Sequence, residues 1–420
     1  MATNGASPEV FIVDACRTPV GRYRGALSGI RPDDLGAAVL RALLGRNPAV
    51  PPDAIEDVIF GAANQAGEDN RNVGRMAALL AGYPIEVGGA TVNRLCGSGL
   101  EAVNQITAGL RCGIGDVGIA GGVEAMSRAP FVLPRTDERL QRRQEFFDTV
   151  LGWRLVNPKM PAEQTIPMGA TAEVLAGELN ISREDQDRFA LESHRRAIAA
   201  QEAGGFDAEL IPVTPPGDPG GTGGVPPTTA AGAATERAPV TADEGPRPDT
   251  TLEKLAKLRP AFVEGGTVTA GNSSSFNDGA AAVLLATEVG MAAHGLEPLA
   301  RVVTWATAGV EPRRMGIGPV PALNKALSRT GWKLEDLAVV ELNEAFAAQS
   351  LAVIRTLGLD LALVNPRGGA IALGHPLGCS GARLMTTLVH QLRDLPAGTR
   401  GAATMCIGVG QGIATLVERV

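Results

Sequence analysis

The chain contains few aromatic residues and few residues of the kinds that form disulfides or bind metals. Aromatic residues make up 4% of the 420 residues, and there are five cysteines and four histidines. The cysteines are odd in number and scattered, and no Cys-x-x-Cys pair occurs, so neither a disulfide framework nor a zinc site is indicated. We therefore expect reduced thiols, no metal and a cytoplasmic location.

Long hydrophobic runs and an excess of positive charge are also missing. No apolar stretch reaches the length of a membrane span, and the first eight residues show no apolar signal-peptide core. The formal net charge is −7, so neither a nucleic-acid nor a membrane partner is expected. Glycine is abundant instead, with 53 residues, which suits tight turns and close helix packing.

Strand-like and helix-like segments alternate along the chain. Short apolar runs at 10–13, 58–60 and 117–122 have the character of buried strands, and the segments between them show helical spacing. This alternation predicts an α/β fold with a largely parallel sheet. At 420 residues, the chain is long enough for two or three domains.

The second half of the chain repeats the plan of the first. Segment 56–64 resembles 335–343, Val92-Asn93 resembles Val364-Asn365, and 118–122 resembles 405–412, all in the same order. One such match can arise by chance, but three in order favour a duplicated βα unit.

The region between the halves, 127–258, has a different character and is interpreted as a loop domain over the active site. It includes a Pro/Gly/Thr-rich tract, 214–239, that cannot bury a core and reads as a flexible surface loop, or simply as a linker.

The segment around Cys96 is the most informative part of the sequence. A strand-like lead-in ends at this cysteine, and helical spacing begins at Leu100. Free backbone N–H groups and the positive end of a helix dipole would favour the thiolate form. Gly97 and Gly99 allow another molecule to approach the backbone closely. The segment is therefore predicted to hold a nucleophile and the oxyanion that it creates.

Three other segments carry polar or nucleophilic residues next to glycines or strand ends. They contain His375 (365–378), Cys406 (405–412) and Asn343 (341–347). Each alone has an ordinary structural explanation, as a turn histidine, a buried cysteine or a helix-capping asparagine. Together they supply the base, the proton donor and the oxyanion donors that a thiol nucleophile needs.

These segments resemble the motifs of the thiolases, CoA-dependent acyltransferases that cleave or form 3-oxoacyl-CoA. The resemblance covers nearly the whole chain and rests on Asn93-Arg94-Leu95-Cys96-Gly97-Ser98-Gly99, Asn343-Glu344-Ala345-Phe346, Gly374-His375-Pro376 and Cys406-Ile407-Gly408. It implies the thiolase fold, in which two duplicated βαβαβαββ halves form a five-layered αβαβα core with an inserted loop domain. The implied divisions are an N-terminal half, 1–126, completed by about 259–296, a loop domain, 127–258, and a C-terminal half, 297–420.

The resemblance also implies a role for each motif residue. Cys96 would be the acylated nucleophile, His375 would take its proton, and Cys406 would protonate the leaving enolate and later deprotonate CoA. The enolate oxygen would be held by His375 and by a water bound to Asn343. The tetrahedral intermediate would be held by the N–H groups of Cys96 and Gly408. CoA would be a co-substrate, with no permanently bound cofactor.

CoA contacts follow from the same resemblance, with some departures from the family pattern. Ser274, Arg247 and Met168 match CoA-binding positions, although Arg247 is equally typical of a solvated surface arginine. Ser275 and Val409 stand where thiolases usually or often have glycine. Pro167 replaces a histidine that is frequent in acetoacetyl-CoA thiolases, which disfavours that substrate.

Within the family, stretches such as 21–28, 63–73 and 147–154 are most similar to the subgroup that acts on 3-oxoadipyl-CoA in aromatic degradation. The implied reaction yields succinyl-CoA and acetyl-CoA. The alternatives are an acetyl-CoA acetyltransferase acting on acetoacetyl-CoA or fatty 3-oxoacyl-CoA, and a non-catalytic acyl-CoA-binding protein of the same fold. Arg71, Arg75 and Arg154 are candidates for binding a distal carboxylate, or simply form surface ion pairs. A homodimer or homotetramer is expected by resemblance.

Overall fold

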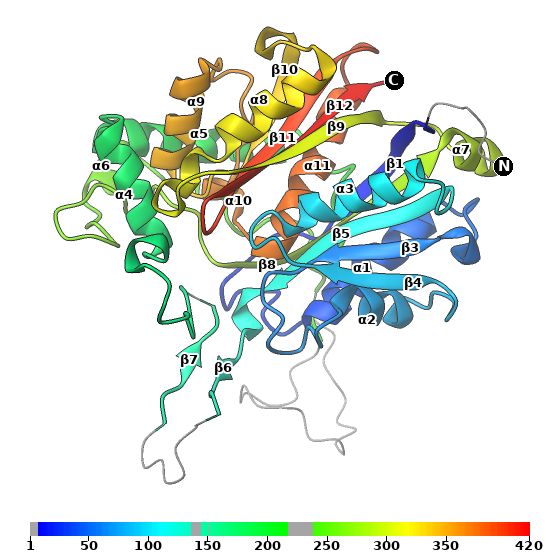
Figure 1. The fold of residues 1–420 in the computed structure, drawn as a ribbon, viewed down its shortest axis with the longest axis horizontal. Coiled ribbons are helices and arrows are strands. Elements are labelled where there is room, and N and C mark those ends of the chain that lie inside the picture. Colours follow the sequence, from blue (N-terminus) through cyan, green and yellow to red (C-terminus); the bar gives the residue numbers. More distant parts are fainter. Residues whose placement is uncertain (1–6, 136–143, 151, 217–237) are drawn as a thin grey trace.

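The structure is a computed structural model that describes residues 7–135, 144–150, 152–216 and 238–420 (Figure 1). Almost all of the predicted Pro/Gly/Thr tract, 214–239, lies outside the described residues.

Most strands belong to one ten-stranded mixed sheet, in the order β10-β11-β12-β9-β1-β8-β5-β3-β4, with β2 paired to β8. The two halves of the chain meet at β1 and β9, which pair at only two positions, Phe11 with Arg301 and Ile12 with Ala300. The strands are β1 (Val10–Arg17), β2 (Gly21–Arg22), β3 (Asp57–Gly61), β4 (Gly88–Val92), β5 (Val117–Ala125), β8 (Asn277–Thr287), β9 (Ala300–Gly309), β10 (Leu337–Leu342), β11 (Arg400–Ile407) and β12 (Gln411–Arg419).

The three strands predicted from apolar runs are confirmed as β1, β3 and β5, but the prediction of a largely parallel sheet is wrong. Parallel pairing of these strands is confined to β3 with β4 and β5, and to β10 with β11. The remaining pairs are antiparallel because β8 returns between β1 and β5 after the loop domain, and because β11 and β12 form a hairpin.

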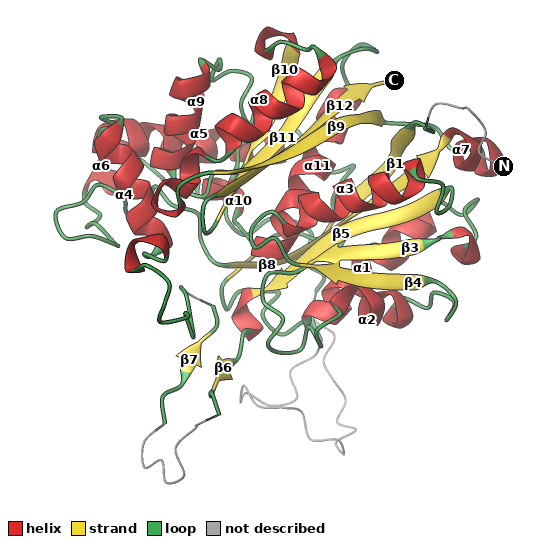
Figure 2. Ribbon diagram, viewed as in Figure 1, coloured by secondary structure: helices red, strands yellow, loops and turns green. Residues whose placement is uncertain are grey.

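Helices cover the sheet halves and also fill the space between them (Figure 2). The core helices are α1 (Pro32–Arg46), α2 (Val73–Leu80), α3 (Ser98–Arg111), α7 (Glu288–His294), α8 (Pro319–Thr330), α9 (Ala347–Leu357), α10 (Ala370–Leu373) and α11 (Leu377–Arg393). The loop region carries α4 (Met168–Glu178), α5 (Arg183–Glu202), α6 (Leu252–Ala256) and the small hairpin β6 (Phe131–Val132) and β7 (Phe147–Asp148). Short 3-10 turns lie at Pro52–Ala54, Met126–Arg128, Ala162–Gln164, Pro312–Ile317 and Leu334–Asp336.

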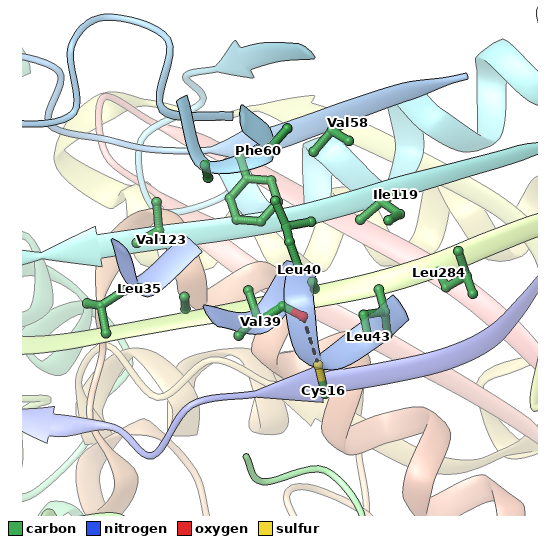
Figure 3. Packing of buried hydrophobic residues seen from close by; sticks show 14 of the residues in the cluster. Cys16, Leu35, Val39, Leu40, Leu43, Val58, Phe60, Ile119, Val123 and Leu284 are labelled. Carbon is green, nitrogen blue, oxygen red and sulfur yellow. Dashed lines mark hydrogen bonds between the residues drawn. The ribbon is translucent and has the colours of Figure 1, made fainter. Parts of the chain in front are cut away.

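Three separate apolar clusters show that the core has five layers. The first joins α1 and α2 to the N-terminal sheet half, with Leu40 packed near Phe60 and the buried Cys16 thiol donating to the Val39 carbonyl (Figure 3). The second holds α3 and α11 between the two sheet halves, and the third joins α8 and α9 to the far face of the C-terminal half. The predicted αβαβα arrangement is therefore confirmed.

The two halves of the chain repeat the same order of elements. The series β3, α2, β4, α3, β5 corresponds to β10, α9, a parallel bridge of Val364 to Val340, α11 and β11. The sequence match of 118–122 with 405–412 is offset from this correspondence. Strand β11 ends at Ile407, and the glycines that follow form the hairpin turn to β12. The match between 118–122 and 405–412 was therefore based on shared glycines and not on equivalent positions in the two strands.

The loop region is joined to the core through a buried arginine. The Arg17 guanidinium of β1 bonds Glu209 at 2.5 Å and Asp243 at 2.7 Å, and all three side chains are fully buried. Burial acts to lower the pKa of Arg17, but the two carboxylates outweigh it and raise that pKa. Since breaking a buried pair leaves an uncompensated charge, this contact holds the loop region against β1.

Helices α3 and α11 approach each other with almost no space between their backbones. A Cβ atom on Gly381 of α11 would lie 2.2 Å from the backbone nitrogen of Leu100, and one on Gly99 of α3 would lie 2.6 Å from that of Ala382. Only glycine allows this approach. Cys96 and His375 lie in the segments that precede these two helices. The helix contact therefore fixes the positions of these two segments relative to each other.

We expect Gly381→Ala to lower the free energy of unfolding by about 1 to 3 kcal/mol, because the added methyl group overpacks the contact between α3 and α11. Gly45→Ala is the matched control, since Gly45 also lies in a helix but no atom is within 4 Å of the added Cβ. Chemical denaturation of both variants checks this. Equal stability of the two variants would contradict the proposed packing constraint.

Candidate active site

Cys96 lies on a sharp turn between β4 and α3. The preceding residue, Leu95, has the left-handed backbone angle φ +48°, which is strained for a branched residue. Asn93 holds the turn, because its side-chain oxygen accepts from Leu95 N–H at 2.9 Å and its amide donates to the Ala63 carbonyl at 2.9 Å. The hydroxyl of Ser98 closes it by bonding the Leu95 carbonyl at 2.6 Å.

The Cys96 thiol is protonated at neutral pH in the unliganded protein. Burial raises its pKa to about 11, and the negative charge of Glu124 acts in the same direction. The N–H groups of Gly408 and of Cys96 itself point at the sulfur and lower the pKa by less. The backbone N–H groups thus act in the direction expected from the sequence, but burial is the larger effect and the net shift of the pKa is upward.

A second thiol, Cys406, lies beside Cys96 at the end of β11. Burial raises the pKa of Cys406, and the charge of the Cys96 thiolate would raise it further. Cys406 belongs to an apolar cluster that also contains Ala345 and Phe346, with Met168 packed against it. Cys96 packs against a different apolar cluster, the one between the sheet halves, so each thiol has largely apolar surroundings.

Gly408 lies two residues beyond Cys406, in the hairpin turn. A Cβ atom at this position would lie 3.0 Å from the Trp153 ring and 3.3 Å from the Leu95 side chain. A larger residue would therefore push on both neighbours and displace the N–H that points at Cys96. The next residue, Val409, has φ +60°, which is unusual for a β-branched residue.

His375 is buried, and Asn277 and Ser380 hold its backbone and its ring in place. Its backbone N–H donates to the Asn277 side-chain oxygen at 2.9 Å, and its ring Nδ1 lies 2.6 Å from the Ser380 hydroxyl. That hydroxyl donates its single hydrogen to the Pro376 carbonyl at 2.8 Å, so it must accept from Nδ1–H. The ring therefore carries its free lone pair on Nε2.

The Nε2 atom of His375 faces the Asn343 amide, at 3.4 Å from Nδ2. Burial, aided by the positive charge of Arg383, lowers the pKa of His375 to about 3. The imidazole is thus neutral at physiological pH, and Nε2 can accept a proton when the resulting charge is stabilised.

Asn343 connects this histidine to the strand that bears Cys406. It follows β10 directly, and its N–H donates to the Thr404 carbonyl of β11 at 3.0 Å. Its side chain is fully buried, and its Oδ1 atom has no hydrogen-bond partner among the described residues. Such an atom is a ready acceptor for a water or a ligand group.

Glu124 ties the loops around the site together. This buried carboxylate of β5 accepts N–H bonds from Ala63 at 2.9 Å, Asn64 at 3.1 Å and Gly378 at 2.8 Å. It therefore joins the loop after β3 to the first turn of α11, which follows His375. Burial, together with the nearby Asp69, raises its pKa to about 7. The structure thus brings Cys96, Cys406, Asn343, His375 and Gly408 to one centre.

The three predicted CoA-binding residues are placed differently from one another. Ser274 lies against the Asn343-containing motif, because its N–H and its hydroxyl both bond the Ala345 carbonyl at 3.0 Å. Met168 packs on the cluster that contains Cys406. Arg247 is exposed, and its backbone N–H donates to His194 at 3.2 Å. No contact among the described residues links Arg247 to the catalytic groups.

Three residues of the site, Ser380, Asn277 and Glu124, were not predicted from the sequence. Ser380 could have been found, because it lies one helical turn beyond His375 in the first turn of α11. Glu124 gave no such signal, since its partners are far away in the sequence and only the fold brings them together. Within the described parts of the chain, no group of three or more His, Cys, Asp or Glu side chains could hold a metal, and no helix is long and apolar enough to cross a membrane.

Two adjacent thiols, a neutral imidazole with a free Nε2 and backbone N–H groups at the nucleophile define an acyltransferase that works through a cysteine thioester. The family profile described as "Thiolase, N-terminal domain" matches residues 10–289, and "Thiolase, C-terminal domain" matches 296–419. The chain belongs to the thiolase family.

Relatives of known name cover essentially the whole chain. It is 54% identical to a beta-ketoadipyl-CoA thiolase of Pseudomonas aeruginosa, over 99% of this chain and 100% of that one. It is also 54% identical to a 3-oxoadipyl-CoA/3-oxo-5,6-dehydrosuberyl-CoA thiolase of Escherichia coli K12, over 98% of this chain and 100% of that one. Human mitochondrial 3-ketoacyl-CoA thiolase in complex with CoA has a similar structure, with a TM-score of 0.88, 38% identity and 99% coverage of both chains.

We expect Ser380→Ala to lower kcat about tenfold, because the lost hydrogen bond no longer selects the His375 tautomer with a free Nε2. KM should stay unchanged, since Ser380 is buried and bonds only His375 and the Pro376 carbonyl among its polar neighbours. Steady-state kinetics check this, with Ser328→Ala, which removes an exposed hydroxyl, as control. An unchanged kcat would show that the tautomer is set by other contacts.

Alkylation of Cys96 by iodoacetamide should accelerate steadily from pH 7 to pH 10. With a pKa of about 11, the thiolate fraction is small at pH 7 and grows about tenfold per pH unit below the pKa. Peptide mapping by mass spectrometry follows Cys96 separately from the exposed Cys112. A plateau below pH 8 would mean that the resting thiol is already ionised.

Proposed function

We propose that the protein cleaves 3-oxoadipyl-CoA with CoA to give succinyl-CoA and acetyl-CoA. The observation that carries the chemistry is the pair of neighbouring thiols together with a neutral imidazole whose unprotonated Nε2 faces the Asn343 amide. The identity to relatives named for beta-ketoadipyl-CoA or 3-oxoadipyl-CoA supports the choice of acyl chain.

The first half-reaction transfers the acyl group to Cys96. His375 Nε2 takes the thiol proton, and the thiolate attacks the 3-oxo carbonyl carbon of the substrate. The bond between C2 and C3 then breaks, and its electron pair passes to the acetyl-CoA enolate. Cys406 gives its proton to C2, which releases acetyl-CoA and leaves the acyl group on Cys96 as a thioester.

Hydrogen-bond donors near the reacting carbonyls would stabilise the negative charge that develops on their oxygens. The backbone N–H groups of Cys96 and Gly408 point at the sulfur and can donate to an oxyanion on the carbon bound to it. Once protonated, His375 Nε2–H can donate to the enolate oxygen. A water on the unpaired Oδ1 of Asn343 would complete that second set of donors.

The second half-reaction returns the acyl group to CoA. Cys406, left as a thiolate, is a strong base because its buried environment raises its pKa. It takes the proton of the incoming CoA thiol, and the CoA thiolate attacks the acyl-Cys96 thioester. The tetrahedral intermediate releases acyl-CoA and expels the Cys96 thiolate, which takes back its proton from protonated His375. Since one thioester is exchanged for another, the step is nearly balanced in energy and reversible. We propose Ser274, Met168 and Arg247 as CoA contacts, in decreasing order of closeness to the centre.

A second candidate is an acetyl-CoA acyltransferase for acetoacetyl-CoA or fatty 3-oxoacyl chains. The apolar surroundings of Cys406, with Phe346 and Met168 nearby, favour it. A non-catalytic acyl-CoA-binding role is disfavoured because the complete set of Cys96, His375 and Cys406 is present and assembled.

We also propose that the protein works in the cytoplasm as a homodimer or homotetramer. The free state of all five cysteines supports a reducing compartment. Apolar side chains exposed on and beside the β6–β7 hairpin, Phe131 and Phe146 among them, support association with further copies.

Thiolysis rates on 3-oxoadipyl-CoA, 3-oxohexanoyl-CoA and acetoacetyl-CoA test the substrate. We expect kcat/KM to be highest for 3-oxoadipyl-CoA, and intact-mass spectrometry without added CoA should detect one succinyl group on Cys96. Cys96→Ser should abolish both signals. Preference for acetoacetyl-CoA would support the second candidate instead.

A further inference from the structure

We infer that Arg154 binds the distal carboxylate of the acyl chain and so selects 3-oxo dicarboxylic substrates. This inference rests on the proposed function, because it assumes that the substrate carries a terminal carboxylate. The relevant observations are the position of the Trp153–Arg154 pair, the unpaired state of the Arg154 guanidinium and the environments of the other candidate arginines.

The pair adjoins the catalytic centre. The Trp153 ring is the nearest group to the Cβ position of Gly408, at 3.0 Å, and the N–H of Gly408 points at the Cys96 sulfur. The Trp153 indole is fixed by a hydrogen bond of 3.3 Å from Nε1 to the Ile166 carbonyl. Trp153 therefore forms part of the wall beside the atom that carries the acyl group.

The pair lies between two left-handed backbone positions. Gly152 and Leu155, on either side, have left-handed φ values of +67° and +53°. Residues 155–159 are exposed, whereas Trp153 and Arg154 are partly buried. Within the described parts of the chain, the Arg154 guanidinium makes neither an ion pair nor a hydrogen bond. Its nitrogens are not among the buried unpaired atoms, so the guanidinium is accessible and free to bind a planar carboxylate.

The other two candidate arginines are less suited to an anionic ligand. The Arg75 guanidinium donates hydrogen bonds to the backbone carbonyls of Val87 and Ile85. Arg71 is exposed, and no contact among the described residues links it to the catalytic groups.

The length of the acyl chain agrees with this placement. In succinyl-Cys96 the carboxylate carbon is three C–C bonds from the thioester carbon, about 4 Å in an extended chain. The chain can therefore run along the Trp153 ring, with its methylene groups on an apolar surface and its charged end beyond the catalytic centre. The next residue along the loop is Arg154.

The test compares Arg154→Met with wild type on 3-oxoadipyl-CoA and 3-oxohexanoyl-CoA, two substrates of equal chain length that differ in the terminal carboxylate. We expect kcat/KM for 3-oxoadipyl-CoA to fall about 10- to 100-fold, the range of a lost charge-assisted hydrogen bond. For 3-oxohexanoyl-CoA it should change less than about twofold. Arg154→Lys should recover part of the loss, since it restores charge without the bidentate geometry.

Arg71→Met serves as the matched charge-removing variant and should keep the wild-type preference. Equal losses on both substrates in Arg154→Met, or loss of preference in Arg71→Met alone, would overturn the inference. A wild-type enzyme that does not prefer 3-oxoadipyl-CoA over 3-oxohexanoyl-CoA would refute the proposed substrate itself. A wild-type preference that survives in Arg154→Met would refute only the role of Arg154.

Discussion

The close contact between α3 and α11 is the constraint on which the rest of the site depends. Each helix starts just beyond a catalytic segment, with Cys96 before α3 and His375 before α11. Glycines at the crossing remove the side chains that would separate the two backbones. Glu124 adds a second link by binding the first turn of α11 through the Gly378 N–H. Groups far apart in sequence are therefore positioned by backbone packing, which varies little with side-chain motion.

Burial determines the charge state of the reaction centre. It raises the pKa of Cys96 and Cys406 and lowers that of His375, so all three groups are neutral before substrate arrives. Charge develops only when a thioester and its carbonyl oxygens occupy the site. The N–H groups at Cys96 and Gly408 then act in surroundings of low dielectric, where such donors stabilise an oxyanion strongly. The same burial that hinders ionisation at rest strengthens stabilisation during the reaction.

In the proposed mechanism, catalysis and substrate choice are carried by different parts of the chain. The groups that we propose to act on the 3-oxo carbonyl lie at strand ends and helix starts of the duplicated core. We place the acyl chain beyond that carbonyl against the loop region, where Trp153 adjoins Gly408. The buried pairs of Arg17 with Glu209 and Asp243 hold the loop region to β1. Changes in the segment around Trp153 can therefore alter the substrate while the catalytic groups stay in place.

The sequence by itself determined the α/β class, the duplicated plan and the motif residues around Cys96, Asn343, His375 and Cys406, because local patterns of apolar residues and glycine encode them. The sequence wrongly predicted a largely parallel sheet, because β8 enters the sheet only after the loop region and pairs antiparallel with β1 and β5. Only the tertiary structure decided the tautomer of His375, the place of Glu124 and the protonated state of Cys96. Those properties arise from burial and from contacts between distant segments, which no local pattern contains.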